Sequence, residues 1–300
     1  MIYTLTLNPA IDHIVRVDKL EIGETNRMYE ESISAGGKGI NASKILKNLD
    51  EESIALGYIA GFTGREVERL VNKEGISSDF IKVENGFTRI NTKIKSEKET
   101  EINGPGLEIT EKDKENLLYK IDEIKDGDYL FLSGSIPSSM DKGFYAEIME
   151  RLSSKDVIIV VDTTGEALKK TLKYVPKLIK PNLRELEDFF NIEIHDNKNI
   201  EKYTRKLQEM GARNIIISMG GDGAYFLSEE GNSLFLKAPK GKVIDTVGSG
   251  DSMVAGFIYA IKESYSLEEA FKFSVSCGSA TAFSEKLATK KEILDLYKNS

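Results

Sequence analysis

Residues 245–257 read DTVGSGDSMVAGF, and this stretch decides how we interpret the rest of the chain. Small and apolar residues continue from Met253 to Ile261 without a polar stripe, which is typical of a helix buried on every side. Gly248 and Gly250 come directly before that helix and allow consecutive backbone N–H groups to point toward one position. Because a helix N-terminus also carries partial positive charge, the stretch predicts an anion-binding loop.

Asp251 follows this loop and allows two interpretations. The structural one is a helix cap or first-turn acid, which the helix dipole favours. The functional one is a general base that accepts a hydroxyl proton beside a transferring phosphoryl group. A cap needs no Gly-Ser-Gly segment before it, so the neighbouring residues favour the base. We therefore expect a catalytic group made of Gly248, Ser249, Gly250 and Asp251.

A second glycine-rich segment, residues 35–41, reads AGGKGIN and precedes an expected helix from Asn41 to about Leu49. Lys38 is followed by glycine rather than Ser or Thr, so this is not a Walker A loop. Together with TVGSGDS at residues 246–252, the segment resembles the two signatures of the ribokinase/PfkB family of carbohydrate kinases. The resemblance covers essentially the whole chain, with the motifs in family order, and implies a ribokinase-like α/β fold.

From residue 107 onward, expected helices alternate with short apolar runs. The expected helices are 110–124, 142–153, 166–173, 183–190 and 198–210, and the expected strands are 129–132, 157–161, 178–179, 214–218 and 224–227. This alternation predicts βαβ units, that is, a doubly wound, mostly parallel sheet flanked by helices. We expect residues 1–300 to form a single α/β domain.

Residues 13–35 and 88–103 read as strands outside that rhythm. Arg89, Asn91 and Lys93 alternate with apolar or small residues, which puts these three side chains on one face of a strand. A solvated strand face is the alternative interpretation. Two such segments converging on a small sheet would form a β-sheet lid, as the resemblance implies.

The resemblance also implies a sugar site under this lid. Asp12 ends the NPAID segment of residues 8–12, directly after the first strand, where α/β proteins commonly bind ligands. A loop-capping role for Asp12 is the alternative. The residues expected to bind the sugar and its phosphate are Asp12, Gly36, Gly37, Lys38, Asn41, Arg89 and Asn91.

Residues 180–186 read KPNLREL, in which Asn182 can cap a helix with Glu185 at capping-box spacing. The resemblance implies that Asn182 and Glu185 also order Mg²⁺ through water beside the phosphates of ATP. Hydrated Mg²⁺ needs few protein carboxylates, so both roles are compatible. The resemblance places ATP along residues 219–223 and the helix near Cys277. The expected nucleotide-binding residues are Lys180, Asn182, Ser218, Gly220, Gly221, Gly223, Thr246, Gly250 and Cys277.

Composition limits the classes of function. The 300 residues carry a formal net charge of -8, which argues against a nucleic-acid partner. The chain enters a strand-like run at once and contains no apolar run of membrane-spanning length, so we expect a cytoplasmic protein with no membrane partner. Cys277 is the only cysteine, which excludes an intramolecular disulfide and is typical of a buried, unreactive thiol.

The resemblance implies an ATP-dependent kinase of a phosphorylated ketohexose. Residues 88–91, 100–104, 282–285 and 287–289 are most similar to the branch that phosphorylates fructose 1-phosphate at its 6-hydroxyl to give fructose 1,6-bisphosphate and ADP. Tagatose 6-phosphate is the alternative acceptor. A sugar-phosphate-binding pseudokinase is the non-enzyme alternative, and the intact Asp251 argues against it. A nicotinamide-dependent dehydrogenase is disfavoured because no Gly-x-Gly-x-x-Gly follows the first strand.

A lid of a few strands leaves apolar faces and edges that are costly when left alone. We therefore expect a homodimer joined through residues 13–35 and 88–103.

Overall fold

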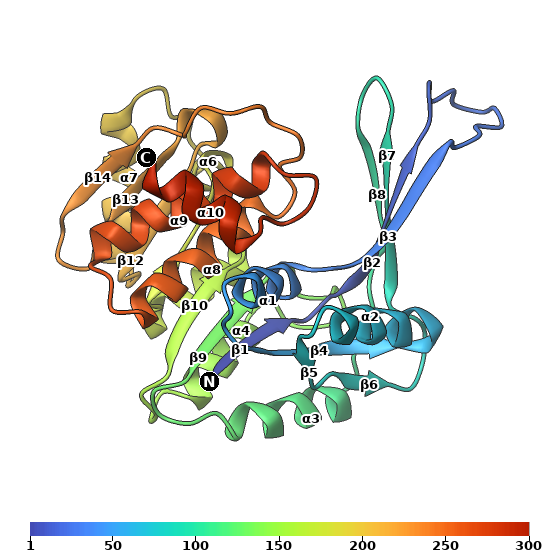
Figure 1. Cartoon of the computed structure of the whole chain (residues 1–300). Helices are drawn as coiled ribbons and strands as arrows, with labels where there is room; N and C mark the ends of the chain where they lie inside the picture. Colours follow the sequence, from blue (N-terminus) through green and yellow to red (C-terminus); the bar gives the residue numbers. More distant parts are fainter. Residues whose placement is uncertain (300) are drawn as a thin grey trace.

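The computed structural model describes residues 1–299, and its largest feature is a ten-stranded sheet (Figure 1). Its strands are β1 (Ile2–Thr6), β4 (Ile54–Ala60), β5 (Ser77–Ser78), β6 (Ile81–Val83), β9 (Tyr129–Ser133), β10 (Ile158–Asp162), β11 (Leu178–Ile179), β12 (Asn214–Ser218), β13 (Ala224–Leu227) and β14 (Ser233–Leu236). The order is β14-β13-β12-β11-β10-β9-β1-β4-β5, with β6 paired to β4 off this path. All pairings from β5 to β12 are parallel, and only β13 and β14 join in antiparallel fashion.

Helices cover both faces of this sheet, so the fold is doubly wound as predicted. One face carries α1 (Lys38–Asn48), α8 (Ser249–Lys262), α9 (Leu267–Ala282) and α10 (Lys290–Lys298). The other carries α3 (Glu111–Asp122), α4 (Phe144–Arg151), α5 (Gly165–Thr171), α6 (Leu183–Phe190) and α7 (Asn197–Glu209). Helix α2 (Gly61–Lys73) covers β4 and reaches the strands of the second sheet.

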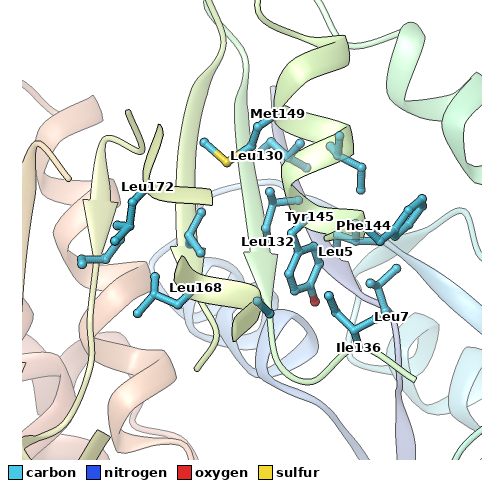
Figure 2. Packing of buried hydrophobic residues seen from close by; sticks show 14 of the residues in the cluster. Leu5, Leu7, Leu130, Leu132, Ile136, Phe144, Tyr145, Met149, Leu168 and Leu172 are labelled. Atoms are coloured by element: carbon cyan, nitrogen blue, oxygen red, sulfur yellow. The ribbon is translucent and has the colours of Figure 1, made fainter. Parts of the chain in front are cut away.

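The central strands are apolar on both sides because each side faces a helical layer. Figure 2 shows Leu130 and Leu132 of β9 directed toward Tyr145 and Met149 of α4. The intervening Phe131 faces the opposite layer. Full burial of such a side chain stabilises the fold by roughly 1.5–3 kcal/mol. The Tyr145 hydroxyl donates to the carbonyl of Ser133 at 2.9 Å, which satisfies its one polar atom.

The second sheet has four strands in the order β3-β2-β7-β8 and projects away from the main body near α2 (Figure 1). Its strands are β2 (Ala10–Arg16), β3 (Glu30–Gly36), β7 (Arg89–Lys95) and β8 (Thr100–Asn103). β2 and β7 pair in parallel, and the outer pairs are antiparallel. The two predicted strand segments converge here. The expected bounds need correction, because β2 begins at Ala10 and residues 17–29 form a connection that is not strand.

The predicted elements after residue 107 are present close to their expected positions. One expected start was wrong, since α1 begins at Lys38 rather than Asn41. No helix within residues 1–299 is long and apolar enough to cross a membrane.

Candidate active site

A cleft of about 640 Å³ lies where the carboxyl ends of the main-sheet strands meet the four-stranded sheet. Thr6, Ser218 and residues 163–164 line it from the ends of β1, β12 and β10. The opposite wall comes from β7 and β8. Ligands of open α/β sheets bind outside the carboxyl ends of the strands, and this cleft has that position.

The floor of the cleft contains the predicted anion loop. Gly248 caps α8 with a left-handed backbone, φ 78°, and an added Cβ there would lie 2.5 Å from Leu287 Cδ2. Glycine avoids both the backbone strain and the close contact. Within residues 1–299, the N–H groups of Gly250 and Asp251 have no hydrogen-bond acceptor. Gly248 and Gly250 line the cleft, whereas Ser249 does not, and its buried hydroxyl oxygen has no hydrogen-bond partner among the described residues.

Asp251 is buried at the third position of α8, with 8% of its surface exposed, and it lines the cleft. Asn41 Nδ2 donates to its Oδ2 at 2.8 Å. Burial, followed by the negative charge of Asp162, raises the pKa of Asp251 to about 6, although Lys38, Asn41 and Lys180 act in the opposite direction. A carboxylate with such a pKa is poised for proton transfer near neutral pH.

Asp162 is a functional candidate that the sequence did not single out, because a lone aspartate after a strand carries no motif of its own. Its carboxylate, at the end of β10, accepts from Lys38 Nζ at 3.1 Å and lies 4.0 Å from Lys180 Nζ. Burial alone would raise the pKa of Asp162, but the two lysines outweigh burial and hold it below its ordinary value. For Lys38, burial acts against the charged form, yet Asp162, Asp251 and Glu185 raise its pKa overall. Asp162 and Lys38 therefore both stay charged near Asp251.

The four-stranded sheet brings Asp12 and Asn91 together. Asn91 Nδ2 donates to Asp12 Oδ1 at 3.1 Å, and both side chains line the cleft. Gly36 does not line it, but an added Cβ would lie 2.4 Å from the Asp12 carboxylate. Gly36 thus makes room for Asp12 rather than contacting a ligand itself. Gly37 and Lys38 line the cleft as expected.

Arg89 lines the cleft from the start of β7. Its guanidinium donates to the carbonyl of Asn8 at 3.2 and 2.9 Å and to that of Gly104 at 3.4 Å. Burial lowers the pKa of Arg89, and Asp12 partly counteracts this. Much of its hydrogen-bonding capacity therefore connects the four-stranded sheet to the segment that follows β1.

Of the residues expected to bind the nucleotide, four line the cleft: Lys180, Asn182, Ser218 and Gly250. The other expected nucleotide-binding residues, Gly220, Gly221, Gly223 and Thr246, lie in neighbouring segments and are not among its lining residues. Cys277 is a buried thiol, as its small-residue surroundings predicted. Its side chain is fully buried, its Sγ packs against Gly256 of α8, and burial raises its pKa, so the thiol is unavailable to a nucleotide and unreactive.

Asn182 and Glu185 form the predicted capping box of α6. Glu185 N donates to Asn182 Oδ1, and Asn182 N donates to Glu185 Oε2, both at 2.8 Å. Both residues also line the cleft. No cluster of three or more His, Cys, Asp or Glu residues suited to a metal occurs among residues 1–299. This donor set fits a hydrated Mg²⁺ that takes most of its ligands from water and phosphate.

Further residues that line the cleft were not among the expected site residues. Besides those described, they are Asn8, Lys93, Glu101, Asn103, Gly134, Ser135 and Val247. Most lie at strand ends or on the polar face of β7 and β8. Strand alternation had placed Lys93 on the same face as Arg89 and Asn91. That pattern could have added Lys93 to the expected site residues.

Comparisons with known proteins agree with this geometry. A model of the pfkB family carbohydrate kinases matches residues 5–293. A Bacillus subtilis protein named 1-phosphofructokinase is 43% identical, covering 99% of this chain and 97% of that protein. A Bacillus licheniformis protein named D-tagatose-1-phosphate kinase is 38% identical, covering 96% and 94%. The crystal structure of phosphofructokinase-2 from Escherichia coli in complex with fructose-6-phosphate has a TM-score of 0.93 at 27% identity, covering 99% of this chain and 98% of that one. Since the match spans nearly the whole chain, this protein belongs to the pfkB family of carbohydrate kinases.

Proposed function

We propose that this protein is a 1-phosphofructokinase, which transfers the γ-phosphoryl group of ATP to the 6-hydroxyl of fructose 1-phosphate. The observation that carries this proposal is the buried Asp251 beside the glycine loop, in a cleft whose other wall is the polar face of the lid. The name of the Bacillus subtilis relative supports the choice of acceptor. Measuring ADP formation from ATP and fructose 1-phosphate tests the proposal directly. An absence of ADP formation would favour the pseudokinase alternative.

In the proposed reaction, Asp251 accepts the proton of the 6-hydroxyl as its oxygen attacks the γ-phosphorus. A new oxygen–phosphorus bond forms, the bond from phosphorus to the β,γ-bridging oxygen breaks, and ADP leaves with that electron pair. The free N–H groups of Gly250 and Asp251 would stabilise charge on the transferring group.

Lys38 and Lys180 both lie beside Asp162, and the positive charge of each lowers the pKa of Asp251. We therefore propose that Lys38 binds the transferring phosphoryl group, not the phosphate that the sugar brings. Lys180 would act beside it, because its ammonium lies against Gly250. Positive charge at this point stabilises negative charge that spreads over the equatorial oxygens in the transition state.

For the sugar, we propose that Asp12, Asn41 and Asn91 contact hydroxyl groups, with Gly36 and Gly37 giving them space. Arg89 would mainly hold the lid in place. We also propose that the four-stranded sheet acts as a lid and that residues 1–300 form a single domain. Ser300 lies outside the described residues.

The nucleotide would lie past Ser218, along Gly220, Gly221 and Gly223, and near Thr246. We propose that Asn182 and Glu185 hold Mg²⁺ through water. When bound, Mg²⁺ neutralises charge on the nucleotide phosphates.

Acceptor preference is the first prediction. We expect kcat/KM to be tenfold to a hundredfold higher with fructose 1-phosphate than with tagatose 6-phosphate, the size that one or two polar contacts of about 1.4 kcal/mol each supply. Tagatose 6-phosphate presents its phosphate at the opposite end and must aim its 1-hydroxyl at Asp251. Steady-state assays with each sugar and saturating ATP measure this ratio. A higher value for tagatose 6-phosphate would overturn the assignment.

Tagatose 1-phosphate is a closer competitor, and the name of the Bacillus licheniformis relative specifically favours including it. It keeps the phosphate on C1 and differs from fructose 1-phosphate only at C4. We expect a smaller preference against it, of about tenfold, because one hydroxyl changes direction. A preference for tagatose 1-phosphate would change the named sugar but not the chemistry.

The second prediction is a homodimer through the lid. Ile33 of β3 and Ile102 of β8 are 53% and 60% exposed, on the face opposite Asp12 and Asn91. Covering this face would remove apolar surface from water. Light scattering at micromolar concentration should give twice the 33.4 kDa of one chain, and Ile102→Asp should give monomers. Val175→Asp, at an exposed site away from the lid, serves as the control. A monomeric natural chain would exclude this assembly.

A further inference from the structure

Lys93 is a buried lysine whose ion pair within residues 1–299 is a long one. It lies on β7, is 7% exposed and lines the cleft. Its nearest acid is Asp12, whose Oδ2 is 3.7 Å from Lys93 Nζ. Across residues 1–299, the Lys93 ammonium donates no hydrogen bond. Lysine is rarely buried without a partner, and its ammonium carries three donors.

The other cations near Lys93, in the four-stranded sheet and in α1, already donate hydrogen bonds to protein acceptors. Lys95 Nζ donates to Asp245 Oδ2 at 2.6 Å. Arg89 donates to two backbone carbonyls, and Lys38 donates to Asp162. Lys93 is therefore the cation on the described part of the lid that is buried, faces the cleft and keeps its donors free.

A second lysine with free donors lies at the other end of the cleft. Lys180 is 5% exposed, and its closest acid, Asp162, is 4.0 Å away. An added Cβ at Gly250 would lie 2.9 Å from Lys180 Nζ, so this ammonium lies at the anion loop. The cleft thus has one under-partnered cation at the loop and one at the lid. A sugar that carries one phosphate and receives another at its far end matches this arrangement.

We propose that Lys93 binds the phosphate that the sugar already carries and thereby makes the enzyme select phosphorylated ketoses over free ones. This inference rests on the proposed function. Asp12, beside Lys93, would receive the hydroxyls next to that phosphate. The positive charge of Lys93 also offsets the Asp12 carboxylate, which would otherwise repel a phosphate dianion. A charge-assisted contact of this kind is stronger than a neutral hydrogen bond.

The experiment uses the full chain with Lys93→Met, Lys93→Arg and, as a matched control, Lys98→Met. Lys98 is exposed in the turn between β7 and β8, so the control removes the same charge from the same sheet without touching the cleft. We measure kcat and KM for fructose 1-phosphate, for unphosphorylated fructose and for ATP. Thermal unfolding verifies that each variant folds.

For Lys93→Met we expect the KM for fructose 1-phosphate to rise tenfold to a hundredfold, with kcat/KM for free fructose and the KM for ATP within about twofold of the natural chain. Lys93→Arg should recover part of the loss, and Lys98→Met should change neither value. The ratio of kcat/KM for the two sugars is decisive, because a merely structural lysine would affect both sugars alike.

An equal loss with both sugars, or an unchanged KM for fructose 1-phosphate, would overturn this assignment and leave Lys93 as a counterion to Asp12. If the natural chain forms no ADP with fructose 1-phosphate, the proposed function itself is wrong. That control is run first, so the two failures are distinguished.

Discussion

Replacing Asp251 with asparagine is expected to lower kcat by roughly 10²- to 10⁴-fold, with little change in the affinity for either substrate. The amide has nearly the same shape and still fits beside Asn41, but it cannot accept the proton of the attacking hydroxyl. Loss of a group that acts only in the transition state lowers kcat without weakening ground-state binding. Steady-state kinetics with ATP and fructose 1-phosphate measure both quantities.

The same substitution should stabilise the protein above pH 6. The folded-state pKa of Asp251 is raised to about 6 from 3.8, mainly by burial. The protonated form therefore adds stability below the unfolded pKa, and this stability is lost as the pH rises through the folded pKa. At pH 8 the buried carboxylate costs on the order of 2 to 3 kcal/mol that asparagine does not. Chemical unfolding at pH 8 should show a higher midpoint for the variant, and the difference should shrink at pH 4.

Asp295→Asn, on the exposed face of α10, is the control for both measurements. A near-normal kcat for Asp251→Asn would show that Asp251 is only a first-turn acid of α8. If activity is lost but stability at pH 8 falls, the substitution has disrupted the loop, and the kinetic result would not identify a base.

Replacing Asp162 with asparagine is expected to lower kcat/KM by about 100-fold or more and to destabilise the fold by on the order of 3 kcal/mol. Asp162 is the shared counterion of Lys38 and Lys180, and its removal takes away the negative charge nearest to both cations. Lys38 would then lose the contact that holds its ammonium beside Asp251. Kinetics and chemical unfolding measure the two effects.

The pH profile distinguishes this positioning role from simple destabilisation. Activity of the natural chain should fall below about pH 6 as Asp251 becomes protonated. The negative charge of Asp162 raises the pKa of Asp251, so removing that charge should shift the acid limb of kcat to lower pH. An unshifted or upward-shifted limb would contradict this coupling. Asp141→Asn, at an exposed site whose carboxylate also faces a lysine, provides the comparison.

Much of the fold was predictable from local pattern. Helices and strands after residue 107 follow from periodicity, and the α6 capping box follows from the spacing of Asn182 and Glu185. The glycine loop and Asp251 were recognisable because a loop and the helix that it begins are contiguous in sequence. The burial of Cys277 was also predictable, because small residues surround it in the sequence, but sequence does not reveal that its Sγ packs against Gly256 of α8.

The sequence by itself determined the alternating α/β architecture, the anion loop and the candidate base, because backbone conformation and side-chain periodicity depend on residues close along the chain. Only the tertiary structure decided the electrostatics of the site. Lys38 and Asp162 are separated by 124 residues, and Asn41 and Asp251 by 210. Which buried charges become partners depends on the order of strands in the sheet, which brings distant carboxyl ends to one edge. For the same reason, only the folded chain shows that Asp162 engages Lys38 while Lys93 keeps its donors free.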